Sequence, residues 1–145
     1  MSSEQIASSS AQSLPDRSVS LTLWYWYWGP VAAYAALIFY GSSLSATPET
    51  VASLVKEVSD KVLHFCEYSV LGALAYRACR NAAGPKVAHS ALSYAIVGCA
   101  FYGLSDETHQ LFVPFREADV VDLMADVAGA SGGGWVWSLL GRERI

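Results

Sequence analysis

The chain has 145 residues, of which 53% are hydrophobic and 15% are charged, and its formal net charge is −4 at pH 7. Its mean hydropathy is +0.30 although its first twenty residues are polar, a composition typical of a small polytopic membrane protein with one domain. An acidic chain lacks the basic face that nucleic acid requires, so we expect no nucleic-acid partner. The cysteines Cys66, Cys79 and Cys99 form no C-x-x-C motif and lie inside apolar runs, which argues against a disulfide framework or a zinc ribbon.

The N-terminal part of the chain divides into a polar tail and an apolar segment. Residues 1–20 are serine-rich and show no hydrophobic period, so we expect a disordered tail. Residues 21–44 reach the roughly 20 residues that a bilayer-spanning helix needs. The block WYWYW at 24–28 favours a helix entering lipid over a strand, because Trp and Tyr are common at membrane interfaces. Its length and late start favour an uncleaved signal anchor over a signal peptide cut near SLSA at 43–46.

The remainder of the chain predicts helices of two kinds. Residues 46–60 are charged and carry apolar residues at helical spacing, which predicts a short amphipathic helix on the surface. Three further apolar segments follow, at residues 62–79, 90–111 and 120–140. The predicted fold is therefore an all-α polytopic membrane domain over residues 21–145. It has four transmembrane helices and the short amphipathic helix between the first and the second.

A stripe of small residues marks the fourth segment, where Gly129 and Gly133 form a G-x-x-x-G pattern. Small residues at this spacing let two helix backbones approach closely. We interpret the stripe as packing within the bundle, and a homo-oligomer through Gly129 and Gly133 is the alternative.

Ionisable side chains gather where the third segment ends and the fourth begins. Asp106 and Glu107 stand four and three residues before Gln110, so the amide is expected beneath both carboxylates. If a helix begins at Asp119, the carboxylates of Asp119, Asp122 and Asp126 share one face of it. Ionisable groups at bilayer depth are costly and tend to mark function, so this region is the candidate site.

The distribution of Lys and Arg predicts the orientation of the chain. Six of these residues fall on the side of the two termini and three on the other side, which predicts that both termini are cytoplasmic. We therefore expect an inner-membrane protein with a polar cluster at its outer end, where Arg116 pairs with an aspartate of the fourth helix. The candidate ligand-binding residues are His64, Glu67, Tyr68, Asp106, Glu107, Gln110, Arg116, Asp119, Asp122 and Asp126.

Three motifs together resemble the VanZ-like membrane protein family over residues 24–140. They are H-x-x-E-Y in the second segment, E-x-x-Q near the end of the third, and R-x-x-D-x-x-D leading into the glycine-rich fourth. The resemblance implies a small bacterial integral membrane protein, and some members of the family are linked to reduced susceptibility to the glycopeptide teicoplanin. On this match the family's motif positions are His64, Glu67, Tyr68, Glu107, Gln110, Arg116, Asp119, Asp122 and Gly129.

Several functions are compatible with an acidic cluster at one membrane end. The favoured hypothesis is a binding module, with the lipid bilayer and an envelope precursor or a glycopeptide as partners. A membrane-embedded metal-dependent hydrolase or transferase is an alternative, although no H-E-x-x-H spacing supports it. A proton-coupled transporter and a purely structural polar cluster are the others. We assign no catalytic residue and predict neither a cofactor nor a resident metal.

Overall fold

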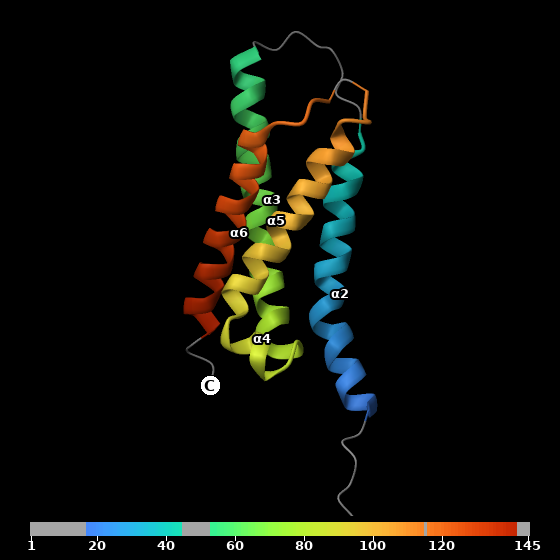
Figure 1. The fold of residues 1–145 in the computed structure, drawn as a ribbon, viewed down its shortest axis with the longest axis vertical. Helices are drawn as coiled ribbons and strands as arrows, with labels where there is room; N and C mark the ends of the chain where they lie inside the picture. The colour runs from blue at the N-terminus through green and yellow to red at the C-terminus, as the bar shows by residue number, and fades with distance from the viewer. Residues whose placement is uncertain (1–16, 45–52, 115, 142–145) are drawn as a thin grey trace, which may run out of the picture.

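The computed structural model describes residues 17–44, 53–114 and 116–141, and for residues 17–20 and 53–59 it describes the backbone alone. These residues form helices and no strand (Figure 1), which confirms the predicted all-α class for the described part of the chain. The helices are α2 (Arg17–Ser42), α3 (Ser53–Ala82), α4 (Pro85–His89), α5 (Ala91–Gln110) and α6 (Val120–Leu140).

The bounds of the predicted apolar segments agree closely with those of the long helices in the C-terminal half of the chain. The fourth segment coincides with α6, because Asp119 caps the start of that helix. The third segment exceeds α5 by one residue at each end. Helix α2 begins at Arg17, so the last four residues of the predicted tail are helical and its boundary at residue 20 is wrong. Residues 1–16 of that tail lie outside the described residues.

The predicted separate amphipathic helix is wrong for residues 53–60. Helix α3 runs without a break from Ser53 to Ala82, so these residues form its first two turns. The physical reason is that no Pro or Gly occurs between residues 49 and 71, and nothing in the local sequence ends the helix before the apolar segment. Residues 46–52 of the predicted helix lie outside the described residues.

A tight turn in the sequence Asn-Ala-Ala-Gly-Pro, at residues 81–85, joins α3 to α4. Gly84 adopts φ 84°, a conformation that favours glycine, and Pro85 occupies the first turn of α4, where its missing N–H costs nothing. The short helix α4 itself was not predicted. Because α4 ends at His89, the helix of the third apolar segment, α5, begins at Ala91.

The long helices form an elongated bundle in which α3 and α6 run in one direction and α2 and α5 in the other (Figure 1). Helices α3 and α6 have the most extensive contact. A methyl group at Gly129 or Gly133 would overlap the carbonyl oxygens of Phe65 or Ser69 on α3, so the backbones touch along this stripe. The predicted packing within the bundle is confirmed. The α3 backbone occupies this stripe, and homo-oligomerisation stays a prediction with no surface assigned to it.

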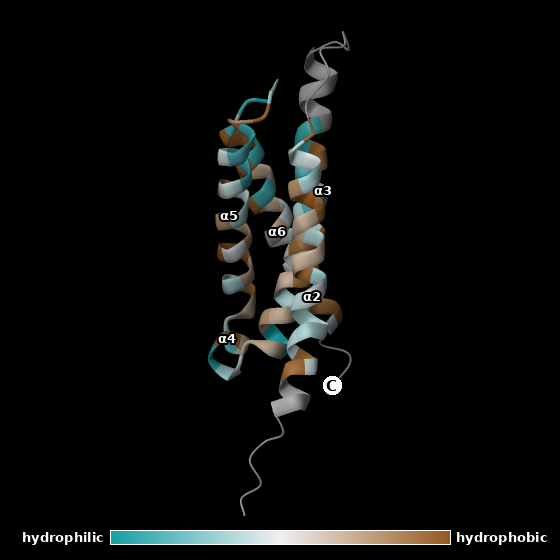
Figure 2. Ribbon diagram, turned by 90° about the vertical axis from the view of Figure 1, so that its right-hand side faces the viewer, coloured by the Kyte–Doolittle hydropathy of each residue, from teal (hydrophilic) through white to brown (hydrophobic). Residues whose placement is uncertain are grey.

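Most large apolar side chains lie on the outside of the bundle, while the core is small. Residues Tyr68, Leu71 and Ala130 are part of the buried apolar cluster, whereas Phe101 is 69% exposed and Val120 is 73% exposed. Figure 2 shows hydrophilic residues gathered at the end of the bundle where α5 ends and α6 begins. Among the described residues, no single helix has both the length and the apolarity needed to cross a membrane.

Candidate functional site

The polar end of the bundle brings together segments that are far apart in the sequence. The chain reverses there from α5 into α6, and the last turn of α2 and an early part of α3 lie at the same end (Figure 1). The buried polar residues at this end are Ser42, His64, Asp106, Glu107, Gln110, Asp122 and Asp126. Six of these seven were predicted site residues, and Ser42 was not. We call this set, together with Lys61, Tyr68 and Asp119, the acidic cluster.

A histidine–aspartate pair joins α3 to α6 at the base of the acidic cluster. His64 Nδ1 lies 2.9 Å from Asp126 Oδ1, and the side chains are 8% and 0% exposed. The glycine stripe one turn further along α6 explains the short distance, because it holds the two backbones together. Asp126 Oδ2 points toward α5, where a Cβ added to Gly103 would lie 2.8 Å from it.

A second buried carboxylate, Asp106, connects α5 to α2. Its Oδ2 accepts a hydrogen bond of 2.7 Å from the Ser42 hydroxyl and a weak one of 3.4 Å from the Gln110 amide. The expected placement of Gln110 beneath both Asp106 and Glu107 is confirmed for Asp106 alone, because among the described residues Glu107 bonds to the Asp119 N–H instead. The sequence signal for Ser42 was a pair of hydroxyl residues in the last turn of an otherwise apolar segment. The second residue of that pair is Ser43, and its hydroxyl Oγ lies 3.0 Å from His109 Nε2.

Glu107 and Asp119 stabilise the start of α6. Asp119 Oδ1 accepts the backbone N–H of Val121 at 2.8 Å, which confirms that α6 begins at this aspartate. Glu107 Oε2 accepts the backbone N–H of Asp119 itself at 2.8 Å. These bonds satisfy N–H groups that the first turn of a helix leaves without helical partners.

Lys61, rather than Arg116, neutralises the aspartates of α6. Lys61 Nζ lies 2.8 Å from Asp119 Oδ2 and 3.2 Å from Asp122 Oδ1. The predicted pairing of Arg116 with an α6 aspartate is wrong, because Arg116 Nε instead donates to the Leu44 carbonyl at 3.5 Å. The Lys61 ammonium lowers the pKa of Asp119, mainly through the hydrogen bond between them.

The acidic cluster contains more buried acceptors than the protein satisfies. Among the described residues, the buried side-chain polar atoms without a hydrogen-bond partner are Tyr68 Oη, Asp106 Oδ1, Glu107 Oε1 and Asp126 Oδ2. All of them belong to this cluster. Buried polar groups in proteins are normally paired, so these atoms are suited to contact with something other than this chain.

Of two other predicted site residues, Glu67 lies beside the acidic cluster and Tyr68 belongs to it. Glu67 is half-buried on α3, within electrostatic range of His64 and Asp106. Tyr68 is fully buried, and its ring lies 6.2 Å from that of Tyr102 on α5.

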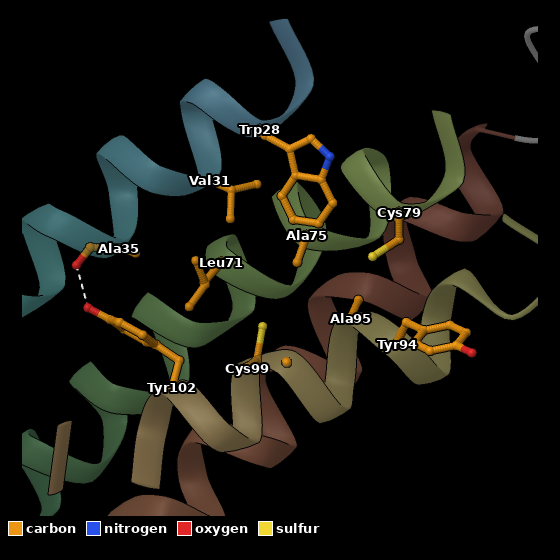
Figure 3. Close-up of a pocket in the computed structure, with 11 residues that line it drawn as sticks. Trp28, Val31, Ala35, Leu71, Ala75, Cys79, Tyr94, Ala95, Cys99 and Tyr102 are labelled. Atoms are coloured by element: carbon orange, nitrogen blue, oxygen red, sulfur yellow. Dashed lines mark hydrogen bonds between the residues drawn. The ribbon is translucent and has the colours of Figure 1, made fainter. Parts of the chain in front are cut away.

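A separate apolar cavity of about 200 Å³ lies between α2, α3 and α5 (Figure 3). Trp28 and Val31 from α2, Leu71 from α3 and Cys99 from α5 line it. The Tyr102 hydroxyl closes one side by donating to the Ala35 carbonyl. The cavity lining is almost entirely apolar, so the acidic cluster remains the candidate site for a polar ligand.

An all-helical bundle with an apolar exterior and an acidic cluster buried at one end defines a class of small proteins with a polar site between helix ends. The chain belongs to the VanZ/LLP1 family, whose profile matches residues 1–141. The resemblance drawn from the three sequence motifs is thereby confirmed. Proteins of this family are generally membrane proteins. No curated protein and no solved structure matches the chain.

Proposed function

We propose that this protein is an integral protein of the bacterial cytoplasmic membrane and that its acidic cluster binds a polar ligand of the cell envelope. The observation that carries the proposal is the set of buried polar atoms at one end of the bundle that have no partner within the described part of the chain. Leaving a buried carboxylate oxygen unpaired costs about 1–3 kcal/mol or more. A ligand that supplies hydrogen-bond donors or positive charge would recover this free energy.

The surface of the bundle supports a membrane location. Large side chains such as Trp26, Phe101 and Val120 are mostly exposed, whereas a soluble bundle presents polar residues on its outer faces. Many of the polar residues that lower the apolarity of α3, α5 and α6 face the interior of the bundle. A bilayer would contact the outer faces, and the family to which the chain belongs is generally of membrane proteins.

The proposed topology places four membrane-embedded helices, α2, α3, α5 and α6, with both termini in the cytoplasm. Figure 1 shows the start of α2 and the end of α6 at the same end of the bundle. The excess of Lys and Arg at that end supports a cytoplasmic position for it. The acidic cluster would then open at the outer surface, where Asp119 is 40% exposed and Asp122 is 12% exposed.

The position at an outer membrane surface favours the headgroup of an envelope precursor as the ligand class. A contribution to the teicoplanin response would follow if the same site bound a glycopeptide or competed for its target. Both sources would present amine or hydroxyl donors to the free carboxylate oxygens.

The test is ligand-induced stabilisation of the protein in lipid nanodiscs. Short-chain phospholipids, a polyprenyl phosphate and teicoplanin are added in turn, and thermal unfolding is followed by circular dichroism. A ligand at one hundred times its Kd stabilises the folded state by about 2.7 kcal/mol. We expect one of these probes to raise Tm in a saturable way in the wild type.

Matched variants identify the binding site. Glu107→Gln should abolish the shift, while Glu117→Gln, which makes the same change at an exposed position, should retain it. The proposal fails if no probe shifts Tm and Glu107→Gln raises the stability of the protein. That outcome would identify the acidic cluster as a structural feature that fixes helix packing.

A further inference from the structure

We propose that the acidic cluster is a binding site for a divalent transition-metal ion, held by His64, Glu107 and Asp122. One ligand atom from each residue lies within 4.8 Å of the other two. The inference deepens the proposed function, on which it rests, because the ion would be the group in the site that contacts the polar ligand.

Glu107 supplies the observation that points to a ligand beyond the acidic residues themselves. Its side chain is 95% buried, since the residue is 5% exposed. One oxygen, Oε2, is fixed by the backbone N–H of Asp119, while Oε1 has no hydrogen-bond partner among the residues that the structure describes. The carboxylate is therefore oriented by the start of α6, and we assign metal ligation to Oε1, because Glu107 belongs to the three-residue group.

His64 is oriented by a carboxylate that is not a ligand. Asp126 Oδ1 lies 2.9 Å from His64 Nδ1, so an ionised Asp126 accepts the Nδ1 proton and leaves the Nε2 lone pair available. Metal-bound histidines usually donate their second ring N–H to a carboxylate in this way, which fixes the tautomer and raises ligand basicity. The pair thus has the arrangement expected behind a metal ligand.

Charge and ligand type indicate which ions fit. Glu107 and Asp122 together supply the two negative charges that neutralise a divalent ion, and an imidazole nitrogen favours Zn²⁺ or Mn²⁺ over Ca²⁺ or Mg²⁺. Lys61 is bound to Asp122 through Oδ1 at 3.2 Å, so we assign metal ligation to the other oxygen.

The geometry requires only a small closure and leaves room for a ligand. A tetrahedral ion with bonds of about 2.1 Å needs ligand atoms about 3.4 Å apart. Side-chain rotations that move these atoms by about 1 Å would complete the site. Three protein ligands leave at least one coordination position open. An oxygen of a phosphate or carboxylate headgroup could occupy that position.

The test measures binding of the metal alone to the full-length protein in nanodiscs after removal of bound metal with EDTA. Calorimetric titration with Zn²⁺ or Mn²⁺ should show one ion per chain. Co²⁺ serves as a spectroscopic probe, because its visible bands and its coupling to imidazole nitrogen report the ligands directly. We expect histidine coordination in the wild type.

Variants separate a built site from an adventitious ion. Glu107→Gln and Asp122→Asn should lose the ion, Asp126→Asn should bind it 10–100-fold more weakly, and Glu117→Gln should bind it as the wild type does. Circular dichroism checks that each variant is folded. If Glu107→Gln is unfolded, the test rests on Asp122→Asn, whose side chain is less buried. Absence of binding, or binding unchanged in the cluster variants, overturns the inference.

The metal and the proposed function can fail separately. Metal binding that depends on the acidic cluster, without a thermal shift from any envelope probe, would support the metal site and overturn the proposed ligand-binding function. A thermal shift that depends on Glu107 but is unchanged by EDTA, in protein that binds no metal, would overturn the metal site and support the proposed function.

Discussion

At the scale of single residues, the cation at the start of α6 is Lys61, although Arg116 lies closer to the aspartates in the sequence. Arg116 is three residues from Asp119 and was the obvious partner, whereas Lys61 is 58 residues away and makes the contact. The cation nearest in the sequence is the expected partner only where contacts are made between sequence neighbours, and this contact joins two different helices. The buried aspartates were predictable because charge in an apolar run must be enclosed by other polar groups. Ser42 was missed because a hydroxyl at a helix end is common.

The ion pair between Lys61 and Asp119 predicts a pH window for its own contribution to stability. The pKa of Asp119 is lowered, so its contribution is present above the ordinary carboxyl pKa and is lost as pH falls through the lower folded-state value. At neutral pH this contribution is complete.

Carbon NMR titration of the aspartate carboxyls checks this window. Lys61→Met should move the pKa of Asp119 upward, toward the ordinary value of about 4. An Asp119 that titrates identically in the wild type and in Lys61→Met would contradict the assignment.

The buried pair of His64 and Asp126 predicts a strong energetic coupling. Removing one partner leaves the other buried and unpaired, which costs about 3–5 kcal/mol. We expect His64→Ala and Asp126→Ala each to destabilise the protein by this amount, and the double variant by clearly less than their sum. Denaturant unfolding of the four proteins in EDTA, in a double-mutant cycle, measures the coupling. Additive effects would show that the pair does not interact.

At the scale of elements, apolar runs predicted the existence of every long helix but not every boundary. The boundary of α6 was predictable because Asp119 is a strong N-cap signal. The start of α3 was not, because the stretch before residue 62 has helical spacing of its own and no residue that separates the two. The glycine stripe of α6 predicted close packing correctly, although only the fold identifies α3 as its partner.

Adjacent glycines of α6 provide a matched test of this packing. Gly133→Ala would place a methyl group on the Ser69 carbonyl, while a methyl group at Gly132 meets nothing within 4 Å. Replacing glycine by alanine inside a helix otherwise stabilises it by about 0.5–1 kcal/mol. We therefore expect Gly132→Ala to raise Tm and Gly133→Ala to lower it, as measured by thermal unfolding in detergent. Equal effects would rule out the close contact.

At the scale of the whole molecule, the convergence of three distant regions on one end was predictable from topology. Successive helices that reverse direction bring the end of one beside the start of the next, which is how α5 and α6 meet (Figure 1). The apolar cavity was not predictable, because it depends on the way Trp28, Leu71 and Cys99 from three helices fit together.

The proposed topology predicts opposite accessibility for the two ends of the bundle. In a cysteine-free background, Glu117→Cys should react with a membrane-impermeant maleimide added to intact cells. Gly141→Cys should react only after the cells are lysed. The reverse pattern would invert the orientation and place the acidic cluster on the cytoplasmic side.

The contact between α3 and α6 fixes the register of these two helices along each other. Sliding α6 by one turn toward the acidic end would bring Trp137 against Ser69, and the opposite slide would bring Ala125 against the Phe65 carbonyl. The two helices therefore form one rigid unit, which keeps His64 and Asp126 opposite each other. Helix α2 bonds to α5 at two levels, through the Ser42 hydroxyl to Asp106 and through the Ala35 carbonyl, which accepts from the Tyr102 hydroxyl. The register of His64 and Asp126 thus follows from glycines three and seven residues further along α6, which share no atom with the pair itself.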